Sequence, residues 1–461
     1  MSISTRFSSI ARLWFGSFSK DELKKFTLLG ITYACIIGLY WTLRATKDSV
    51  FMSMVGGEHL NLAKIISVWL LLPVVLIYTK LLSSFPRHRM LYFLAAVYGG
   101  GTIIFGLLFL DPVHGLSNTQ VSVSRLIGWL WYAFVESYGS LMPALFWAFA
   151  TDTTGPDAAR RGFPLVVTIA QTLSIMGPLF LTRLAHGDSF GSTAHVVIAC
   201  GVLLFLIAVF TMILMRVVPQ SQFVGYRPAH ESDAAQERKK PGFFDGLKLL
   251  VSEPYLLAIF LLVGSYETII TLIDYNFKNL AGQVVLSESA RTLYFGQYAT
   301  WINIVSAACL WLGASNIQRR LGLRVSLVVM PVVVGFAVAA FYLFPVVTVL
   351  FWVMVGAKAL NYAINSPSIK QLYVPTSANA KYQSQAWIDT FGARGAKALG
   401  SGFSMIQKPL GVLFGKQSAF HWYLLCSTGF SSLLIVCWVS LALYLGSRYH
   451  DAVEHKEVIG Q

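Results

Sequence analysis

Long apolar runs separated by short polar stretches dominate the chain. The runs that are long enough to cross a bilayer as a helix, which takes roughly 17 to 25 residues, lie at 26–43, 61–79, 90–110, 122–150, 163–183, 195–217, 254–274, 297–315, 324–344, 346–366, 388–415 and 420–447. This pattern predicts an all-α integral membrane protein with twelve transmembrane helices. The remaining segments are too short to hold a soluble catalytic domain.

The longest polar interval divides the chain into two halves of six predicted helices each. It contains three prolines and a run of charged residues at 237–240, as linkers commonly do. The predicted organisation is a cytoplasmic tail, a first six-helix half, a linker, a second six-helix half and a second tail, with the respective bounds 1–25, 26–217, 218–250, 251–447 and 448–461.

The two halves also show a weak internal repeat. A constant offset of 226 residues places Asp48 over Asp274, and it also places Trp147 over Tyr373 and Gln171 over Lys397. Two parallel six-helix halves are the architecture of major-facilitator-type carriers. We therefore expect a major-facilitator-like fold.

Composition and charge agree with this class. Only 12% of the 461 residues are charged, about half the fraction found in soluble proteins. Most of the 35 lysines and arginines fall on one side if the amino terminus is cytoplasmic, so the positive-inside rule predicts that both termini are cytoplasmic. The net charge of +14 then reflects topology, and we expect no nucleic-acid partner. The five cysteines lack metal-type spacing, and we expect no metal site and no cofactor.

Ionisable side chains inside the spans of the first half are candidates for function, because each costs free energy at bilayer depth. Arg44 and Lys47 end the first span. They would suit either an anion site or an interfacial anchor. Glu136 lies in the fourth span on a face with Trp147, where a proton-coupling or gating role and a structural buried pair both remain open.

The second half carries more of these residues. Asp274 lies four residues before Lys278, which permits an ion pair that either opens during transport or is purely structural. Lys358, Asn361 and Asn365 share one helical face, which would suit a ligand or would hold helices together. Arg394 and Lys397 lie in a glycine-rich segment, a pattern that favours an anion site.

The inward-facing cations outnumber the carboxylates if Asp274 is tied to Lys278, and this excess predicts a multiply charged anionic substrate. The sequence contains no HExxH or GxxxxGK[ST] motif. We therefore expect a secondary transporter and no enzyme.

Several motifs resemble those of the ATP/ADP translocase family of plastids and intracellular bacteria. They are LRATKD at 43–48, LFWAFA at 145–150, AARRGFP at 158–164 and GAKALG at 395–400. The resemblance implies a twelve-helix carrier that exchanges ATP for ADP by alternating access. It also implies functional roles for Lys47, Glu136, Asp274 and Lys397. In this reading Lys47, Lys397 and Arg394 contact phosphates, while Lys358, Asn361, Asn365 and Trp147 contact the base and ribose.

Two departures from the family pattern keep other substrates open. Asp274 stands where glutamate is usual, and Asp152 stands where an amide is usual. The alternatives are a proton-coupled nucleotide importer, an NAD/ADP exchanger, and a carrier of a non-nucleotide organic anion. A receptor that keeps a carrier scaffold is a further alternative. We expect a monomer in a bacterial inner membrane, with membrane lipid and nucleotides as its partners.

Overall fold

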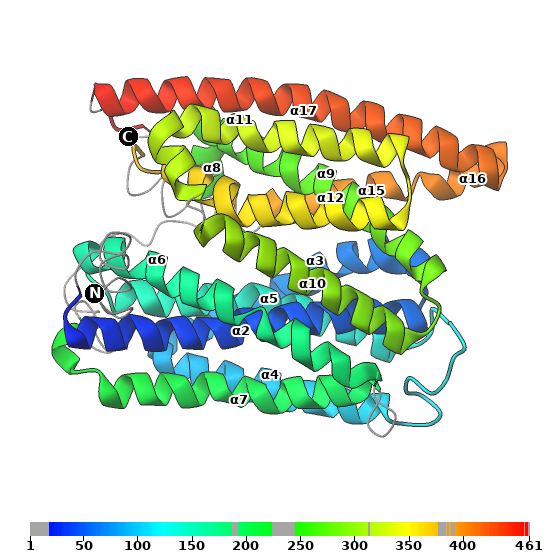
Figure 1. Ribbon diagram of the computed structural model, residues 1–461, viewed down its shortest axis with the longest axis horizontal. Coiled ribbons are helices and arrows are strands. Elements are labelled where there is room, and N and C mark those ends of the chain that lie inside the picture. Colours follow the sequence, from blue (N-terminus) through cyan, green and yellow to red (C-terminus); the bar gives the residue numbers. More distant parts are fainter. Residues whose placement is uncertain are drawn as a thin grey trace, which may run out of the picture. The chain divides into compact units, whose positions relative to one another are not determined.

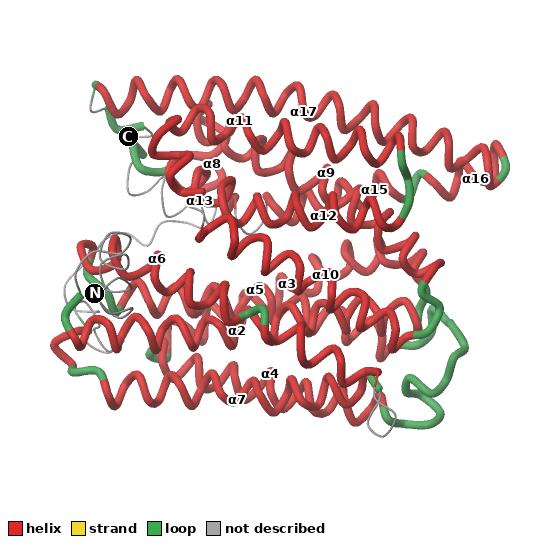
Figure 2. Tube along the Cα trace, in the orientation of Figure 1, coloured by secondary structure: helices red, strands yellow, loops and turns green. Residues whose placement is uncertain are grey.

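The computed structural model describes residues 18–186, 192–223, 245–311, 314–376, 384, 387–388, 392–455 and 457–459. Within these ranges the chain is built from helices joined by short loops (Figure 2). Most of the predicted linker, at 224–244, and most of the predicted amino-terminal tail, at 1–17, lie outside the described residues.

The first half of the sequence forms helices that follow the predicted runs. They are α2 (Lys20–Met54), η1 (Gly57–His59), α3 (Leu60–Ser84), α4 (Arg87–Phe109), α5 (Leu126–Asp152), α6 (Pro156–Leu173), η2 (Gly177–Leu181), η3 (Thr182–His186), α7 (Thr193–Val217) and η4 (Gln220–Gln222).

The second half is also helical in its described parts. Its elements are α8 (Asp245–Ser252), α9 (Pro254–Val284), α10 (Glu288–Trp311), α11 (Ala314–Leu343), α12 (Val347–Leu360), η6 (Asn361–Asn365), α13 (Ser366–Leu372), α15 (Ala393–Ser404), α16 (Gln407–Phe414) and α17 (Lys416–Glu454). Across the described parts of both halves, nine helices are long and apolar enough to cross a membrane. The protein is thus a multi-pass membrane protein, and the count of twelve spans stays a prediction.

Two compact units make up the chain, and their bounds differ from a simple division into halves. Unit 1 comprises Met1–Gly56, Trp69–Glu237 and Leu286–Ile304. Unit 2 comprises Gly57–Val68, Arg238–Val285 and Val305–Gln461. The start of α3 therefore belongs to unit 2, and most of α10 belongs to unit 1. Each sequence half contributes a piece of helix to the unit formed mainly by the other half.

Each unit has its own helix packing (Figure 1). In unit 1, α2 packs against α5, α6 and α7, and α4 packs against α7. In unit 2, α9 packs against α15 and α17, and α11 packs against α17. Helix α2 carries the candidates Arg44 and Lys47, and helix α9 carries Asp274.

Helix α2 is longer than the apolar run from which it was predicted. It begins with a capping box, in which the Ser19 hydroxyl accepts a hydrogen bond from the Glu22 N–H (3.1 Å) and the Ser19 N–H donates to Glu22 Oε2 (2.8 Å). The first span was predicted to end in the turn that holds Arg44 and Lys47, but the helix continues to Met54. The predicted end was wrong because buried partners for the charged turn, described below, let the helix pass through it.

A backbone-to-backbone contact fixes α2 against η2 in unit 1. A Cβ atom on Gly177 would lie 2.4 Å from the carbonyl oxygen of Gly38. Small residues permit such close approach between membrane helices. The spacing of α2 and η2 is therefore set by the missing side chain at position 177.

We expect Gly177→Ala to lower the free energy of unfolding by about 1 to 3 kcal/mol, because the methyl group must push the two backbones apart. Thermal unfolding of the purified protein in detergent measures this loss. Gly100→Ala on α4 is the matched control, because its added methyl group meets no atom within 4 Å. Equal thermal midpoints for the two variants would contradict the packing argument.

Candidate functional site

A buried ion-pair cluster joins α2 to α5 in unit 1. Lys47 Nζ donates a hydrogen bond to Glu136 Oε1 and lies 3.6 Å from Asp48 Oδ1. The ammonium group also lies 4.0 Å from the centre of the Tyr132 ring. Lys47 and Asp48 are buried, whereas the Glu136 side chain is 37% exposed. We call Lys47, Asp48 and Glu136 the Lys47 cluster.

A second cluster surrounds Asp274 in unit 2. Asp274 Oδ1 lies 2.7 Å from Lys358 Nζ, while Oδ2 lies 2.8 Å from Lys278 Nζ and 3.5 Å from Lys64 Nζ. The carboxylate, Lys278 and Lys358 are buried, and the Lys64 side chain is 16% exposed. These four residues form what we call the Asp274 cluster, which α3, α9 and α12 supply together.

The two clusters occupy equivalent places in the internal repeat but have opposite charge. The offset of 226 residues relates Asp48 to Asp274 and also relates Tyr132 to Lys358. The Lys47 cluster has one lysine with two carboxylates. The Asp274 cluster has one carboxylate with three lysines. A lysine in place of an aromatic ring is one source of this difference.

Four of the predicted residues are thus placed in ion pairs that link helices, and the predicted pair of Asp274 and Lys278 forms. Lys47 meets Glu136, and Lys358 meets Asp274. Removing one partner of a buried ion pair strongly destabilises a protein, because the other charge is left uncompensated. The site roles of these residues stay predictions.

The predicted residues of α15 have a different environment. Lys397 Nζ lies 3.6 Å from Glu267 Oε2 and its side chain is 49% exposed, while Arg394 is half-buried. The small residues of α15 let it approach α9 closely, because a Cβ atom on Gly400 would lie 2.6 Å from the Thr268 carbonyl oxygen. Gly400 therefore serves helix packing, and Lys397 reaches α9 at Glu267, outside the Asp274 cluster.

Aromatic contacts in unit 1 favour packing roles for Arg44 and Trp147. The Arg44 guanidinium lies over the Trp41 ring at 5.2 Å from its centre. The Trp147 ring meets the rings of Tyr33 and Phe163 edge-on, with centroid distances of 5.2 and 5.3 Å. A phosphate contact for Arg44 and base stacking on Trp147 stay predictions.

The predicted face of Lys358, Asn361 and Asn365 is altered by local backbone geometry. Residues Asn361–Asn365 form a π-helical turn, which departs from the α-helical periodicity that the prediction assumed. Within this turn Asn365 Nδ2 donates to Asn361 Oδ1 at 2.7 Å. Lys358 meanwhile turns to Asp274, so the lysine and the two amides have separate partners.

Sequence reasoning missed Lys64. It is a lone charge within the predicted span 61–79, and the same argument from membrane cost would have selected it. Its partner Asp274 lies in the other half of the sequence, so no local spacing could have predicted the pair.

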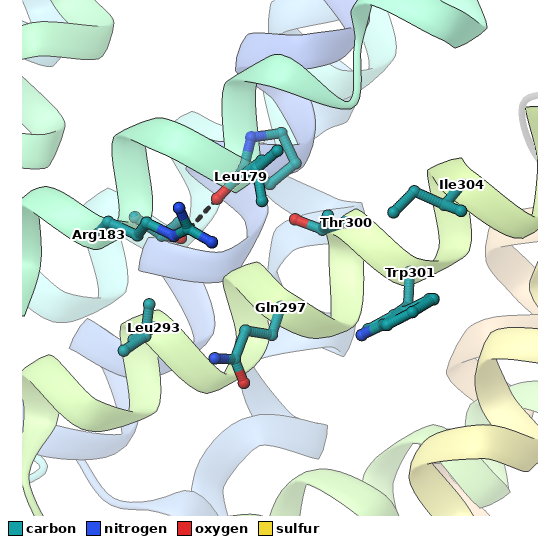
Figure 3. A pocket seen from close by; sticks show the side chains of 9 residues that line it. Leu179, Arg183, Leu293, Gln297, Thr300, Trp301 and Ile304 are labelled. Atoms are coloured by element: carbon teal, nitrogen blue, oxygen red, sulfur yellow. Dashed lines mark hydrogen bonds between the residues drawn. The ribbon is translucent and has the colours of Figure 1, made fainter.

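A cavity in unit 1 was also missed. It has a volume of about 340 Å³ and lies between α10 and the segment formed by η2 and η3. Figure 3 shows the side chains of Arg183, Gln297 and Trp301 around it. Most of its other lining residues are apolar, so it offers few polar groups to a ligand.

Comparisons with known proteins place these observations in a family. Residues 2–449 match the family described as TLC ATP/ADP transporter. The chain is 26% identical to ADP,ATP carrier protein 1 of Chlamydia muridarum, over 95% of this chain and 90% of the relative.

Solved transporters share its fold. A bacterial homologue of the iron transporter ferroportin, in an inward-facing state, matches with a TM-score of 0.58 and 16% identity over 92% of this chain and 99% of the other. A D-xylose–proton symporter matches with a TM-score of 0.58 and 13% identity over 90% of this chain and 97% of the other. These likenesses identify a major-facilitator-type fold, and the family match identifies a transporter. Because the family match spans nearly the whole chain, this protein belongs to the TLC ATP/ADP transporter family.

Proposed function

We propose that the protein exchanges ATP for ADP across a membrane by alternating access. The observation that carries this proposal is the match of residues 2–449 to the TLC ATP/ADP transporter family. The lysines around Asp274 are ionisable groups inside a membrane protein, and such groups commonly mark a substrate path. Nucleoside di- and triphosphates are multiply charged anions with oxygens that accept hydrogen bonds from ammonium groups.

Family membership supports the nucleotide as substrate. The Chlamydia relative is named an ADP,ATP carrier protein, and the similarity extends along nearly its whole length. The Lys47 cluster supports a cycle that is coupled to substrate, because its ion pairs join α2 to α5 and can exchange partners as the carrier changes state. We place the carrier in a bacterial inner membrane as a monomer with both termini in the cytoplasm.

Uptake of radiolabelled ATP into liposomes that contain the purified protein tests the proposal. We expect internal ADP to accelerate the uptake strongly, because an exchanger reorients only when it is loaded. Empty liposomes and liposomes loaded with adenosine are the controls. A competition panel with GTP, UTP, CTP and NAD defines the base and substrate preference.

Other outcomes would identify the alternatives. Uptake that needs no internal ADP and collapses with an uncoupler would identify a proton-coupled importer. Acceleration by internal ADP of NAD uptake, with ATP uptake unaffected, would identify an NAD/ADP exchanger. Inactivity with every nucleotide, together with exchange of a sugar phosphate or an organic acid, would overturn the proposal in favour of a non-nucleotide anion.

A further inference from the structure

The cavity of unit 1 has the size and the lining of a small-molecule site. Its volume of about 340 Å³ falls within the range of ligand pockets, roughly 300 to 1,000 Å³. Such pockets are mostly apolar and carry a few polar groups that orient the ligand. The apolar walls are Pro178, Leu179, Leu293 and Ile304. The remaining side chains therefore indicate which class of ligand the cavity fits.

Close packing of α10 against η3 holds this cavity in place. A Cβ atom on Gly296 would collide with the Thr182 side chain, so the two segments touch at this glycine. Beside the contact, Gln297, Trp301 and Ile304 follow one another at spacings of four and three residues and line one face of α10. The lining residues all belong to unit 1. The cavity is therefore a feature of one compact unit.

An indole ring lines the cavity. The Trp301 side chain is 41% exposed, and Figure 3 shows Trp301 and Gln297 extending from α10 and Arg183 extending from the neighbouring η3. Nucleobases stack on aromatic side chains of this kind. Because every base has a π-face, stacking favours a base as ligand without selecting among the bases.

The Gln297 amide supplies the means of selection. The side chain is exposed, and it forms no hydrogen bond with the described part of the chain. A carboxamide has one donor and one acceptor, which match the adenine edge with its amino donor at N6 and its acceptor at N7. Guanine presents two acceptors, O6 and N7, at the same edge. The amide therefore favours adenine over guanine.

The η3 side of the cavity adds groups that suit the ribose and a phosphate. Arg183 is exposed and makes no ion pair with the residues that the structure describes. Guanidinium groups bind phosphate with two parallel hydrogen bonds. Thr182 and Thr300 donate their hydroxyl hydrogens to the carbonyl oxygens of Pro178 and Gly296. Their own oxygens can still accept hydrogen bonds from ribose hydroxyl groups.

The side chains that the family resemblance suggested for the base have other neighbours. Trp147 meets the rings of Tyr33 and Phe163. Asn365 donates a hydrogen bond to Asn361. These contacts are made within the protein, whereas the indole and the amide of α10 line a cavity. The cavity is thus the better candidate for base recognition.

We propose that this cavity is the adenine subsite of the carrier. The base stacks on Trp301, the Gln297 amide pairs with its N6 and N7 edge, and Arg183 binds the phosphate next to the ribose. This proposal rests on the proposed function and deepens it, because it assigns base recognition to α10 and η3 of unit 1.

Isothermal titration of the purified, full-length carrier in detergent tests the subsite with ADP, GDP and adenosine as probes. Trp301→Ala should raise the Kd for ADP and for GDP alike by about tenfold, because stacking does not distinguish the bases. Gln297→Leu should raise the Kd for ADP by about tenfold and change the Kd for GDP by less than about twofold. A general structural loss would not alter the ratio of the two Kd values.

Further variants separate the phosphate contact and the ring from the fold. Arg183→Gln should raise the Kd for ADP by about tenfold and leave the Kd for adenosine, which lacks phosphate, within about twofold. Trp301→Phe keeps a ring for stacking and should hold the Kd for ADP within about threefold of the parent. Trp422→Ala is the matched control, because Trp422 is 44% exposed and lies outside the cavity. If Trp301→Ala fails to fold, the exposed Gln297 still provides the test.

The outcomes distinguish the subsite from the transport function. If the parent binds ADP and the variants Trp301→Ala, Gln297→Leu and Arg183→Gln bind it as tightly, the subsite is overturned and ATP/ADP exchange stands. If ADP binding depends on Trp301 and Gln297 but the carrier exchanges no nucleotide in liposomes, the subsite stands and the exchange function fails. Loss of a co-purified anionic phospholipid from Arg183→Gln in native mass spectrometry, with the Kd for ADP unchanged, would identify a lipid site and overturn the proposal.

Discussion

The Asp274→Asn carrier should unfold at a markedly lower temperature than the parent. The substitution leaves three lysine ammonium groups close together without their shared carboxylate. Removing one partner of a buried ion pair costs about 3 to 5 kcal/mol.

Thermal unfolding of the detergent-purified protein checks this expectation. Asp21→Asn is the matched control, because Asp21 pairs with Lys24 at an exposed site, and exposed pairs contribute at most about 1 kcal/mol. An unchanged midpoint for Asp274→Asn would show that the lysines do not depend on this carboxylate.

Lys47→Gln is expected to abolish ATP/ADP exchange and to destabilise the protein strongly, and a second substitution should reveal which carboxylate is responsible. Glu136 makes the shorter contact with Lys47, but its side chain is 37% exposed and can be hydrated. Asp48 is buried. The lost stability, about 3 to 5 kcal/mol for a buried charge left alone, should therefore come mainly from Asp48.

A double-mutant comparison checks this assignment. Lys47→Gln with Asp48→Asn should recover more of the thermal midpoint than Lys47→Gln with Glu136→Gln. Neither double variant should recover exchange, measured as uptake of labelled ATP into ADP-loaded liposomes. Greater recovery with the Glu136→Gln partner would place the main energetic coupling on Glu136, and normal exchange by Lys47→Gln would remove Lys47 from the transport cycle.

Hydrophobic patterning predicted the helical membrane fold because each span must bury an apolar surface of fixed length. The same patterning misplaced the end of α2. The charges at Arg44, Lys47 and Asp48 interrupt the apolar run, although the helix continues to Met54. The ion pair of Lys47 with Glu136 on α5 helps to explain how that turn stays buried. A sequence pattern shows that a charged residue lies in an apolar run, but it does not show which residue on another helix pairs with it.

The candidate site shows the same limit. The pair of Asp274 and Lys278 was predictable, because four residues along a helix bring two side chains together. The contacts of Asp274 with Lys64 and Lys358 depend on the packing of three helices. The π-helical turn Asn361–Asn365 was likewise hidden, because its residues are compatible with an ordinary α-helix.

The two aspartates related by the internal repeat also bear on how such carriers can diversify. Asp48 and Asp274 hold the same place in the two halves, while the groups around them differ, as Tyr132 and Lys358 do. In a repeated structure the same aspartate can be kept in both halves while its neighbours change independently in each. A few substitutions around one aspartate can then change the local charge, while the other aspartate keeps its own ion pairs.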